Sequence, residues 1–363
     1  MKICRSCILP LSEHVTSSED ENQCYLCNYS TNKADINNNT KDLNEVIEKI
    51  KASAKNSNFD CLVGVSGGRD STFLLYQLVK KHNLRCLAAY HRTPFTPDII
   101  DDNVKRITKT LNVPLIRMDI SNDKHKVFTR NMLEIWLKRP NSIIANLCCA
   151  PCKKHNFEIF KIARKNKIKY VILGSNQYET FQLGAGQFRQ KHSTILNRSK
   201  LIESFLQLSL VIKRGLSILT RYPVLFKYLS TIIKSSLVYL NNRTIFLRVL
   251  FPQINSVDYF FVAGYNEKEV NELIKEINYK IPENCNSLWR ADCSFNEIKN
   301  IMFKYSSGIN YMDAYLSNMV RSGVLNREEA LNRINQESKI NKDRLGEVCN
   351  ILDVPSSTFD KFI

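Results

Sequence analysis

The sequence contains no apolar run long enough to cross a membrane. Residues 201 to 250 form the most apolar stretch, but one acidic and seven basic residues interrupt it, whereas a membrane-spanning helix needs about 20 consecutive apolar residues. We therefore predict no transmembrane segment. No apolar run follows Met1 either, so the sequence predicts no secretory signal peptide and a location in the cytoplasm.

Glycine, proline and acidic residues are also scarce. The 363 residues include only 11 Gly and 10 Pro, and 44% are hydrophobic, which excludes a collagen-like or broadly disordered chain. The 35 acidic residues are outnumbered by 52 basic ones, giving a net charge of +17. This excess favours a polyanionic partner such as nucleic acid, a nucleotide-linked substrate or an acidic membrane surface. A Lys- and Asn-rich composition without such a partner is the alternative.

Cysteine, in contrast, is abundant, with 12 residues. In a cytoplasmic protein such cysteines bind metals or act in catalysis more often than they form disulfides. The first four have the spacing C-x2-C-x16-C-x2-C and are Cys4, Cys7, Cys24 and Cys27. Zn²⁺ binds four thiolates at about 2.3 Å, and each CxxC turn places two sulfurs on one side of the ion. We predict a structural zinc knuckle here, with an iron centre as the alternative.

A strand, a glycine turn and a helix follow one another from residue 60 onward. Residues 60 to 65 form a buried apolar run, and the helical pattern begins near residue 71. The turn between them reads SGGRDS and comprises Ser66, Gly67, Gly68, Arg69, Asp70 and Ser71. Such a turn presents backbone N–H groups and a helix N-terminus to an anion. The pattern predicts a phosphate site that is neither a P-loop nor a GxGxxG fingerprint.

Further strands alternate with helices along the next hundred residues. The strand patterns cover 85–91, 113–120 and 170–176. This alternation predicts an α/β fold with a doubly wound parallel sheet. Ligands of such sheets bind at the carboxyl ends of the strands, so we expect 66–71, 90–93 and 174–176 to share one edge.

SGGRDS in this context resembles the pyrophosphate loop of the ATP-pyrophosphatase (PP-loop) superfamily, whose fold is adenine nucleotide alpha-hydrolase-like. The resemblance implies that the protein binds ATP and Mg²⁺, that a substrate oxygen attacks the α-phosphate, and that a nucleophile then displaces AMP. It also implies roles for single residues: Ser66, Gly67, Gly68 and Ser71 hold phosphate, Arg69 adds charge, Asp70 helps to hold Mg²⁺, and His91, Gly174 and Asn176 flank the nucleotide.

A second cysteine motif, LCCAPC at 147–152, precedes a helical pattern. A helix N-terminus favours the thiolate form of a cysteine. Cys149 and Cys152 resemble the CxxC of transfer-RNA thiolases, in which two cysteines and a later third one bind an iron-sulfur cluster or carry sulfur. Cys285 and Cys293 are the candidates for the third ligand of a 4Fe-4S cluster. Buried, unreactive cysteines are the alternative.

A wider set of segments resembles the N-acetyl-sugar amidotransferases of bacterial surface-polysaccharide biosynthesis. The segments are CRSCILP, SGGRDS, PFTPDII, GSNQYETFQLG and DAYLSNMVRSGVLNREEAL. The resemblance implies adenylation of an acetamido oxygen on a nucleotide-linked sugar and its replacement by ammonia, which a partner glutaminase and an ammonia-channel protein supply. This function is our first hypothesis, with Asp70, Cys149 and Cys152 as catalytic candidates.

Two other functions stay open. One is an ATP-dependent thiolase that transfers sulfur to tRNA or a small molecule, with RNA as a partner. The other is a nucleotide-sensing module without catalysis. In either enzyme, Trp289, Arg290 and Asp292 are candidates for the acceptor pocket, with structural packing as the alternative.

The patterns divide the chain into five parts. They are a zinc-ribbon-like knuckle (1–30), a linker with one helix (31–59), the PP-loop ATP-binding α/β domain (60–198), a basic apolar helical insert (199–257), and a last part (258–363) that completes the core and ends in helices. The basic face of the insert is either solvated or in contact with an anionic substrate or membrane surface.

Overall fold

The computed structural model describes the chain except residues 1, 13–14, 18, 30–42, 56, 119–121, 180–215, 240–249 and 286. Three predictions fall partly outside the described residues: the linker over 31–42, the end of the 60–198 domain, and much of the 199–257 insert.

Five parallel strands form one sheet. They are β1 (Cys61–Val65), β2 (Cys86–Tyr90), β3 (Leu115–Arg117), β4 (Tyr170–Leu173) and β5 (Asn255–Asp258). Their order is β3-β2-β1-β4-β5, and every neighbouring pair is parallel. This confirms the predicted doubly wound α/β fold. The strand order reverses between β1 and β4, which is the position where such sheets bind ligands.

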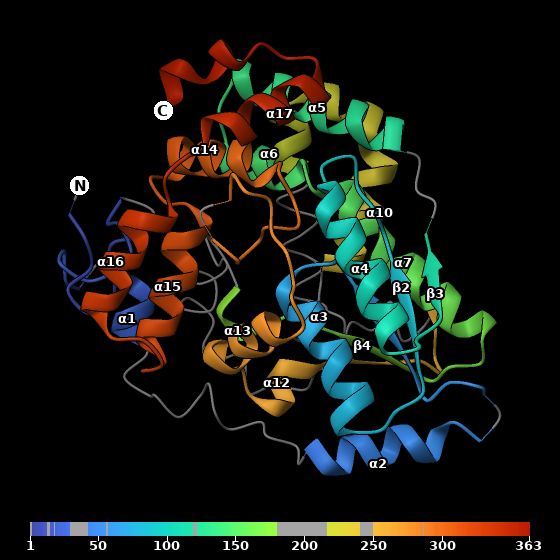
Figure 1. Ribbon diagram of the computed structural model, residues 1–363. Helices are drawn as coiled ribbons and strands as arrows, with labels where there is room; N and C mark the ends of the chain where they lie inside the picture. The colour runs from blue at the N-terminus through green and yellow to red at the C-terminus, as the bar shows by residue number, and fades with distance from the viewer. Residues whose placement is uncertain are drawn as a thin grey trace.

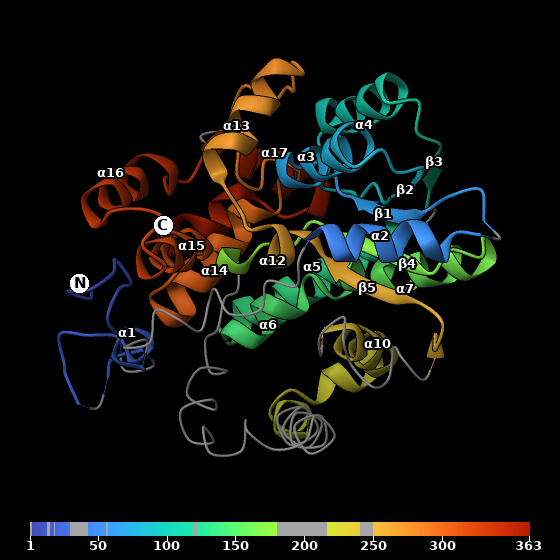
Figure 2. The ribbon, with the colours of Figure 1, turned by 90° about the horizontal axis from the view of Figure 1, so that it is seen from below.

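The two faces of the sheet pack against different helices. Alternate residues of a strand point to opposite faces, and β1 is buried on both. Val63 belongs to the core that includes α3 (Arg69–Tyr76) and α4 (Asp98–Thr110), whereas Leu62 belongs to the core that includes α7 (Ala150–Lys165). Figure 2 shows α3 and α4 on one side of the sheet and α7 on the other. Helices on both faces explain the continuous apolar runs of β1 and β2.

Two described elements of the insert are a 3-10 helix, Pro223–Tyr228, and the helix α10 (Leu229–Tyr239) that follows it. Helix α10 packs on α7. Helices α5 (Asn122–Lys138) and α6 (Ser142–Leu147) lead into α7. In the described part of the chain, no helix has the length and apolarity needed to cross a bilayer.

The C-terminal part is helical, as predicted. Its helices are α12 (Tyr259–Ala263), α13 (Glu267–Glu276), α14 (Asn296–Ser307), α15 (Tyr311–Arg321), α16 (Arg327–Glu337) and α17 (Lys342–Leu352), followed by a 3-10 helix, Ser356–Phe362. Asparagine caps four of them, because the side chains of Asn266, Asn310, Asn326 and Asn341 accept hydrogen bonds from backbone N–H groups of the first turn.

The N-terminal segment lies beside α15 and α16, although these helices are far from it in the sequence (Figure 1). It contains one short helix, α1 (Tyr25–Tyr29), and is followed by α2 (Leu43–Ser53), which corresponds to the helix expected in the linker. Ile309 from the α14–α15 connection joins the small apolar core of this segment.

Candidate functional site

The loop after β1 is shaped by its two glycines. Gly67 has φ +84°, and a Cβ atom there would lie 2.6 Å from Cγ2 of Ile100, so only glycine fits this turn. The Ser66 hydroxyl accepts a hydrogen bond from the Gly68 N–H, and the Ser71 hydroxyl accepts one from the Ser66 N–H, each at 3.2 Å. The predicted strand-turn-helix is therefore present, with α3 beginning at Arg69.

The loop opens into a cavity of about 390 Å³ at the carboxyl ends of the strands. Most predicted site residues line this cavity: Ser66, Gly68, Arg69, Asp70, Ser71, His91, Cys149, Cys152 and Gly174. Gly67, Asn176 and Cys285 are not among the residues that line it. A Cβ atom on Gly174 would lie 3.4 Å from the Cα of Ser71, so this glycine lets the segment after β4 approach α3 closely.

Asp70 is held in place from three directions. It accepts hydrogen bonds from the Tyr265 hydroxyl (2.9 Å), the Asn176 amide (3.0 Å) and Nε of Arg69 (3.0 Å). Burial raises the pKa of Asp70 to about 6, although Arg69 opposes this shift, and Glu179 raises the pKa further. Asn176 thus acts on the site by positioning Asp70.

Arg69 is only 4% exposed, and its guanidinium is fully engaged with protein groups. It contacts Glu267 at 2.9 Å and donates to the hydroxyls of Tyr265 and Tyr315. The resemblance implies that Arg69 adds positive charge for phosphate binding. In this structure its guanidinium instead links Asp70 to the C-terminal helices.

Two further carboxylates face the same cavity. Glu179 accepts a hydrogen bond from the Trp289 indole N–H at 2.8 Å. Asp292 is hydrogen-bonded to Ser66, and burial raises its pKa. With Asp70 they offer the oxygen ligands that Mg²⁺ prefers, and Mg²⁺ sites of this kind are completed by substrate phosphates and water. The residues present therefore fit a Mg²⁺ ion that accompanies a nucleotide.

Three cysteines lie on another side of the cavity: Cys149, Cys152 and Cys293. Cys149 is the N-cap of α7, and Cys152 lies in its first turn. Burial opposes ionisation of Cys149, but Lys299 and Lys153 outweigh this effect and lower its pKa. Burial raises the pKa of Cys293 to about 12. The structure thus brings Cys293 to the CxxC, as one of the two candidates for a third cysteine.

The other candidate, Cys285, lies elsewhere, with its sulfur 2.6 Å from Nη1 of Arg344. His91 lines the cavity and stacks on His125, with ring centroids 6.3 Å apart. Nε2 of His125 is 3.5 Å from the sulfur of Cys152. Burial lowers the pKa of both histidines, so neutral imidazoles support the cysteine side of the cavity.

The loop before α14 supplies an aromatic and cationic side. Trp289 stacks on Tyr315, with ring centroids 4.7 Å apart and planes 17° apart. The guanidinium of Arg290 lies over Trp289 and Tyr311, at 4.9 and 4.7 Å from the ring centroids. Lys299 of α14 also lines the cavity. The sequence predicted Trp289, Arg290 and Asp292 here but missed Lys299, whose only signal was its place in an amphipathic helix.

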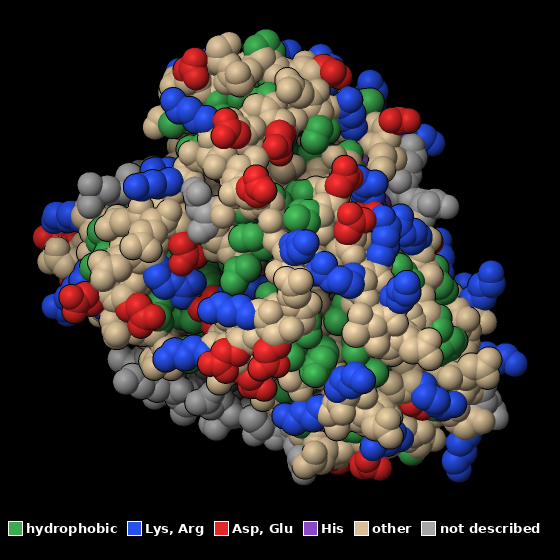
Figure 3. Space-filling view, viewed as in Figure 1, with side chains coloured by type: hydrophobic (Ala, Val, Ile, Leu, Met, Phe, Trp, Pro, Cys, Tyr) green, Lys and Arg blue, Asp and Glu red, His purple; other side chains and the backbone are tan. Residues whose placement is uncertain are grey.

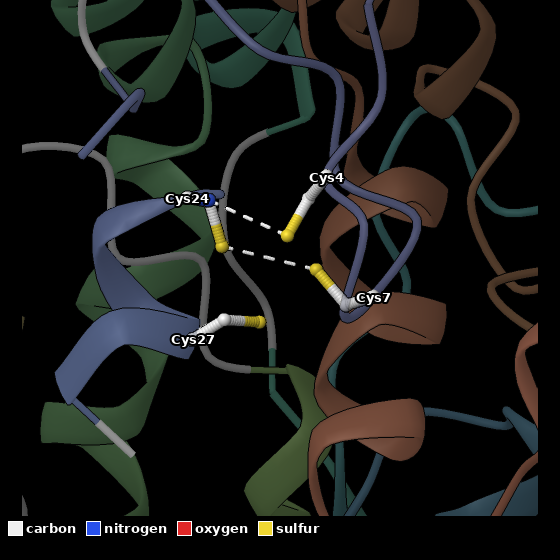
Figure 4. A group of neighbouring side chains, drawn as sticks. All are labelled: Cys4, Cys7, Cys24 and Cys27. Carbon is white, nitrogen blue, oxygen red and sulfur yellow. Dashed lines mark hydrogen bonds between the residues drawn. The ribbon is translucent and has the colours of Figure 1, made fainter. Parts of the chain in front are cut away.

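The four N-terminal cysteines form a separate group. Their sulfurs all lie within 4.8 Å of one another, and Figure 4 shows them pointing to a common centre. The Cys7 and Cys24 sulfurs are 3.8 Å apart, and four sulfurs at 2.3 Å from a tetrahedral zinc ion are also about 3.8 Å apart. Grouping and donor chemistry therefore fit the predicted Zn²⁺ site, which would leave no position open for substrate.

A half-buried arginine faces this sulfur group. Nη1 of Arg321, at the end of α15, is 3.2 Å from the Cys7 sulfur and 3.9 Å from those of Cys24 and Cys27. Arg327 of α16 donates hydrogen bonds to the carbonyl oxygens of Cys7 and Cys4. Four thiolates around Zn²⁺ carry a net negative charge, which the Arg321 guanidinium is placed to balance.

Comparisons with known proteins give only weak similarities. No family model matches the chain, and no curated protein matches it. NMN synthetase from Francisella tularensis is 14% identical, with a TM-score of 0.38 over 81% of this chain and 90% of that one. The U34-tRNA thiolase NcsA from Methanococcus maripaludis, solved with its 4Fe-4S cluster, is 16% identical, with a TM-score of 0.34 over 94% of this chain and 91% of that one. Similarities this weak carry no inference about substrate or cofactors.

Proposed function

We propose that the protein is an ATP-dependent adenylating enzyme that forms AMP and pyrophosphate. The observation that carries this proposal is the SGGRDS turn, which opens at the strand-order reversal into a cavity that also holds Asp70 and Glu179. A volume of about 390 Å³ lies within the range of small-molecule sites. A helix N-terminus on one side and carboxylates on the other suit the phosphates of Mg²⁺-bound ATP.

The residues divide the work of holding the nucleotide. Backbone N–H groups and hydroxyls of Ser66 and Ser71 hold the pyrophosphate, and Asp70 and Glu179 hold the metal ion. Mg²⁺ supplies positive charge that screens the triphosphate. Arg69 and Asn176 fix the orientation of the Asp70 carboxylate through their hydrogen bonds.

The acceptor that we propose is an N-acetyl group on a nucleotide-linked sugar. The acetamido oxygen attacks the α-phosphorus of ATP, the bond from that phosphorus to the bridging oxygen breaks, and pyrophosphate leaves. Ammonia then adds to the activated carbon, the carbon–oxygen bond breaks, AMP leaves, and loss of a proton gives the acetamidino group. A partner glutaminase and a channel-forming protein are the proposed ammonia source.

The placement of the resembling segments supports this acceptor. Residues of three of them line the cavity, namely Ser66 of SGGRDS, Thr96 of PFTPDII and Glu179 of GSNQYETFQLG. The other two segments meet where Arg321 and Arg327 contact the knuckle cysteines. Segments that are far apart in the sequence therefore gather around the cavity and the knuckle.

Sulfur transfer is the second candidate, because Cys149, Cys152 and Cys293 line the same cavity. These three residues would hold a 4Fe-4S cluster or carry sulfur, and tRNA or a small molecule would be the acceptor. On the face shown in Figure 3, Lys and Arg side chains are interspersed with Asp and Glu, so that face has no continuous basic stripe of the kind that tracks a nucleic-acid backbone.

Anaerobic purification followed by metal and product analysis separates the two candidates. The amidotransferase proposal predicts about one zinc per chain, no iron or acid-labile sulfide, and AMP formation that depends on a nucleotide-linked N-acetyl sugar and ammonium. With ¹⁵N-ammonium, the label should enter the sugar product. A brown protein with about four irons, lost in Cys149→Ser or Cys152→Ser, would instead support sulfur transfer.

A further inference from the structure

Two cations line the cavity: the buried Lys299 and the half-buried Arg290. Lys299 is 6% exposed, and Arg290 lies in the loop before α14. In the part of the chain that the structure describes, neither forms an ion pair with Asp or Glu within 4.0 Å. Nε of Arg290 is buried and has no hydrogen-bond partner. Burying a cation without an ion pair is costly, so this arrangement leaves a place for an anion that the described residues do not supply.

The backbone of Arg290 is also in a conformation that a long side chain rarely adopts. Its φ is +56°, in the left-handed region that favours Gly and Asn. The Asn296 amide holds this conformation by donating to the Arg290 carbonyl oxygen at 3.1 Å. Strained residues of this kind persist where a binding function needs them.

The groups around the two cations compensate them only in part. Nζ of Lys299 lies 4.3 Å from the centroid of the Tyr311 ring, and Arg290 also lies over this ring. Lys299 donates a hydrogen bond to Cys149. One sulfur carries at most one negative charge, and Lys153 acts on the same sulfur. Three cations, Lys299, Lys153 and Arg290, therefore act on this one sulfur.

The carboxylates of the cavity act on Arg290 from a distance: Glu179 and Asp292 raise its pKa, but among the described residues no Asp or Glu oxygen forms an ion pair with it within 4.0 Å. Glu179 accepts from the Trp289 indole, and Asp292 is hydrogen-bonded to Ser66. Asp70 is held by Arg69 and two neutral donors. In the proposed function, the SGGRDS turn and a Mg²⁺ ion already compensate the charge of the ATP triphosphate. Arg290 and Lys299 are therefore not needed for this purpose.

We propose that Arg290 and Lys299 form a second anion-binding subsite, which takes a phosphate group of the nucleotide-linked acceptor. This inference rests on the proposed function, because it names the part of the acceptor that the cavity recognises. A neutral sugar amide would leave the two cations unpaired, whereas a nucleoside diphosphate provides charge for both. Bound there, the acceptor shares the cavity with ATP and brings its acetamido oxygen to the α-phosphate.

The test compares Lys299→Met with Lys304→Met. Both remove one positive charge from α14, but Lys304 is exposed and does not line the cavity. Without ligand, Lys299→Met should unfold at a temperature no lower than that of the wild type, because the burial cost that it removes offsets the lost attraction to Cys149. Lys304→Met should leave the unfolding temperature unchanged. A lower unfolding temperature for Lys299→Met would show a structural role and overturn the proposal.

Ligand binding gives the second readout, by calorimetry with Mg²⁺-ATP and with uridine diphosphate N-acetylglucosamine as separate probes. Lys299→Met should weaken binding of the sugar nucleotide at least tenfold and change Mg²⁺-ATP binding less than twofold. Arg290→Asn should do the same, since Asn tolerates the left-handed backbone, and it serves if Lys299→Met does not fold.

Three results would contradict the subsite. They are equal weakening of both probes, which would assign the cations to ATP; unchanged binding of both; and a wild type that binds Mg²⁺-ATP but neither the sugar nucleotide nor uridine diphosphate. Failure of the proposed function would give a different result. In that case the wild type would not bind Mg²⁺-ATP, which would contradict the nucleotide site itself.

Discussion

The protein uses cysteine in two regions with opposite electrostatic requirements. The four knuckle cysteines bring their sulfurs within 4.8 Å of one another, and Arg321 faces them. The cavity cysteines, Cys149, Cys152 and Cys293, lie around an open volume beside Arg290 and Lys299. Both groups contain a CxxC, so this spacing alone does not distinguish them. The two groups differ in whether the sulfurs converge on one point and in the charge of the neighbouring residues.

In each region, the charge that the protein itself leaves unbalanced suggests the kind of ligand. Four converging thiolates repel one another, and a single Arg321 cannot neutralise them, which supports the prediction that the knuckle holds a cation such as Zn²⁺. The cavity has the cations Arg290 and Lys299 on one side and carboxylates at the phosphate loop, which supports our proposal that it takes anions and a Mg²⁺ ion. We propose a structural role for the first region and a catalytic role for the second.

The largest expected effect breaks the knuckle. Cys7→Ser removes one of four zinc ligands and the sulfur closest to Arg321, so zinc content should fall from about one per chain to near zero. The N-terminal segment should then become sensitive to limited proteolysis. Cys285→Ser is the matched control, since Cys285 lies outside both groups, and it should keep its zinc. Full zinc retention in Cys7→Ser would refute the four-sulfur site.

Asp70→Asn should impair catalysis in the cavity and leave zinc binding in the knuckle unchanged. Loss of the carboxylate weakens the hold on Mg²⁺, and we expect AMP formation to fall at least 100-fold, or about 3 kcal/mol. Zinc content should stay at about one per chain. The measurement is nucleotide product analysis at saturating ATP, and activity within threefold of the wild type would contradict the assignment.

The same variant sharpens the comparison through pH. The pKa of Asp70 is about 6 in the folded protein against an ordinary value of 3.8, so ionisation of this largely buried carboxyl disfavours folding. Its effect is absent below about pH 4 and complete above about pH 6, where it costs ~3 kcal/mol. Asp70→Asn should therefore gain more stability over the wild type at pH 7.5 than at pH 4, measured by urea unfolding without Mg²⁺. An equal difference at both pH values would contradict this account.

Arg321→Gln should have the smallest of these effects. It removes the charge that balances the thiolates but leaves all four ligands, so we expect zinc affinity to fall by about 10- to 100-fold. Competition with a chromophoric chelator measures this change. Arg327→Gln, which loses hydrogen bonds to backbone carbonyls instead, is the control and should change zinc affinity less than Arg321→Gln does.

The sequence predicted the features that depend on local pattern. The turn at Gly67 and the apolar run of β1 are encoded within a few residues, and so are the helical periods of α13 and α14. Strand β5 was missed because its four residues, NSVD, are polar and short, and it pairs with β4 at the edge of the sheet. Helix α15 overlaps the segment DAYLSNMVRSGVLNREEAL, for which the sequence pattern gives no separate helix prediction.

The contacts that complete the site are distant in the sequence. Arg69 pairs with Glu267, about two hundred residues away, so its engagement with the C-terminal helices has no local signal. The choice between Cys285 and Cys293 depends on the path of the loop before α14. Lys299 has the pattern of an ordinary helix residue, and only the packing of Tyr311 and Cys149 around it shows that it is buried.

The central claim is that the turn between β1 and α3 binds the pyrophosphate part of ATP. A crystal structure of the protein with Mg²⁺ and a non-hydrolysable ATP analogue tests it directly. We predict that the β- and γ-phosphates contact residues 66 to 71 and that an Asp70 oxygen ligates Mg²⁺. A nucleotide bound elsewhere, with the Asp292 carboxylate still hydrogen-bonded to Ser66 in the turn, would contradict the claim.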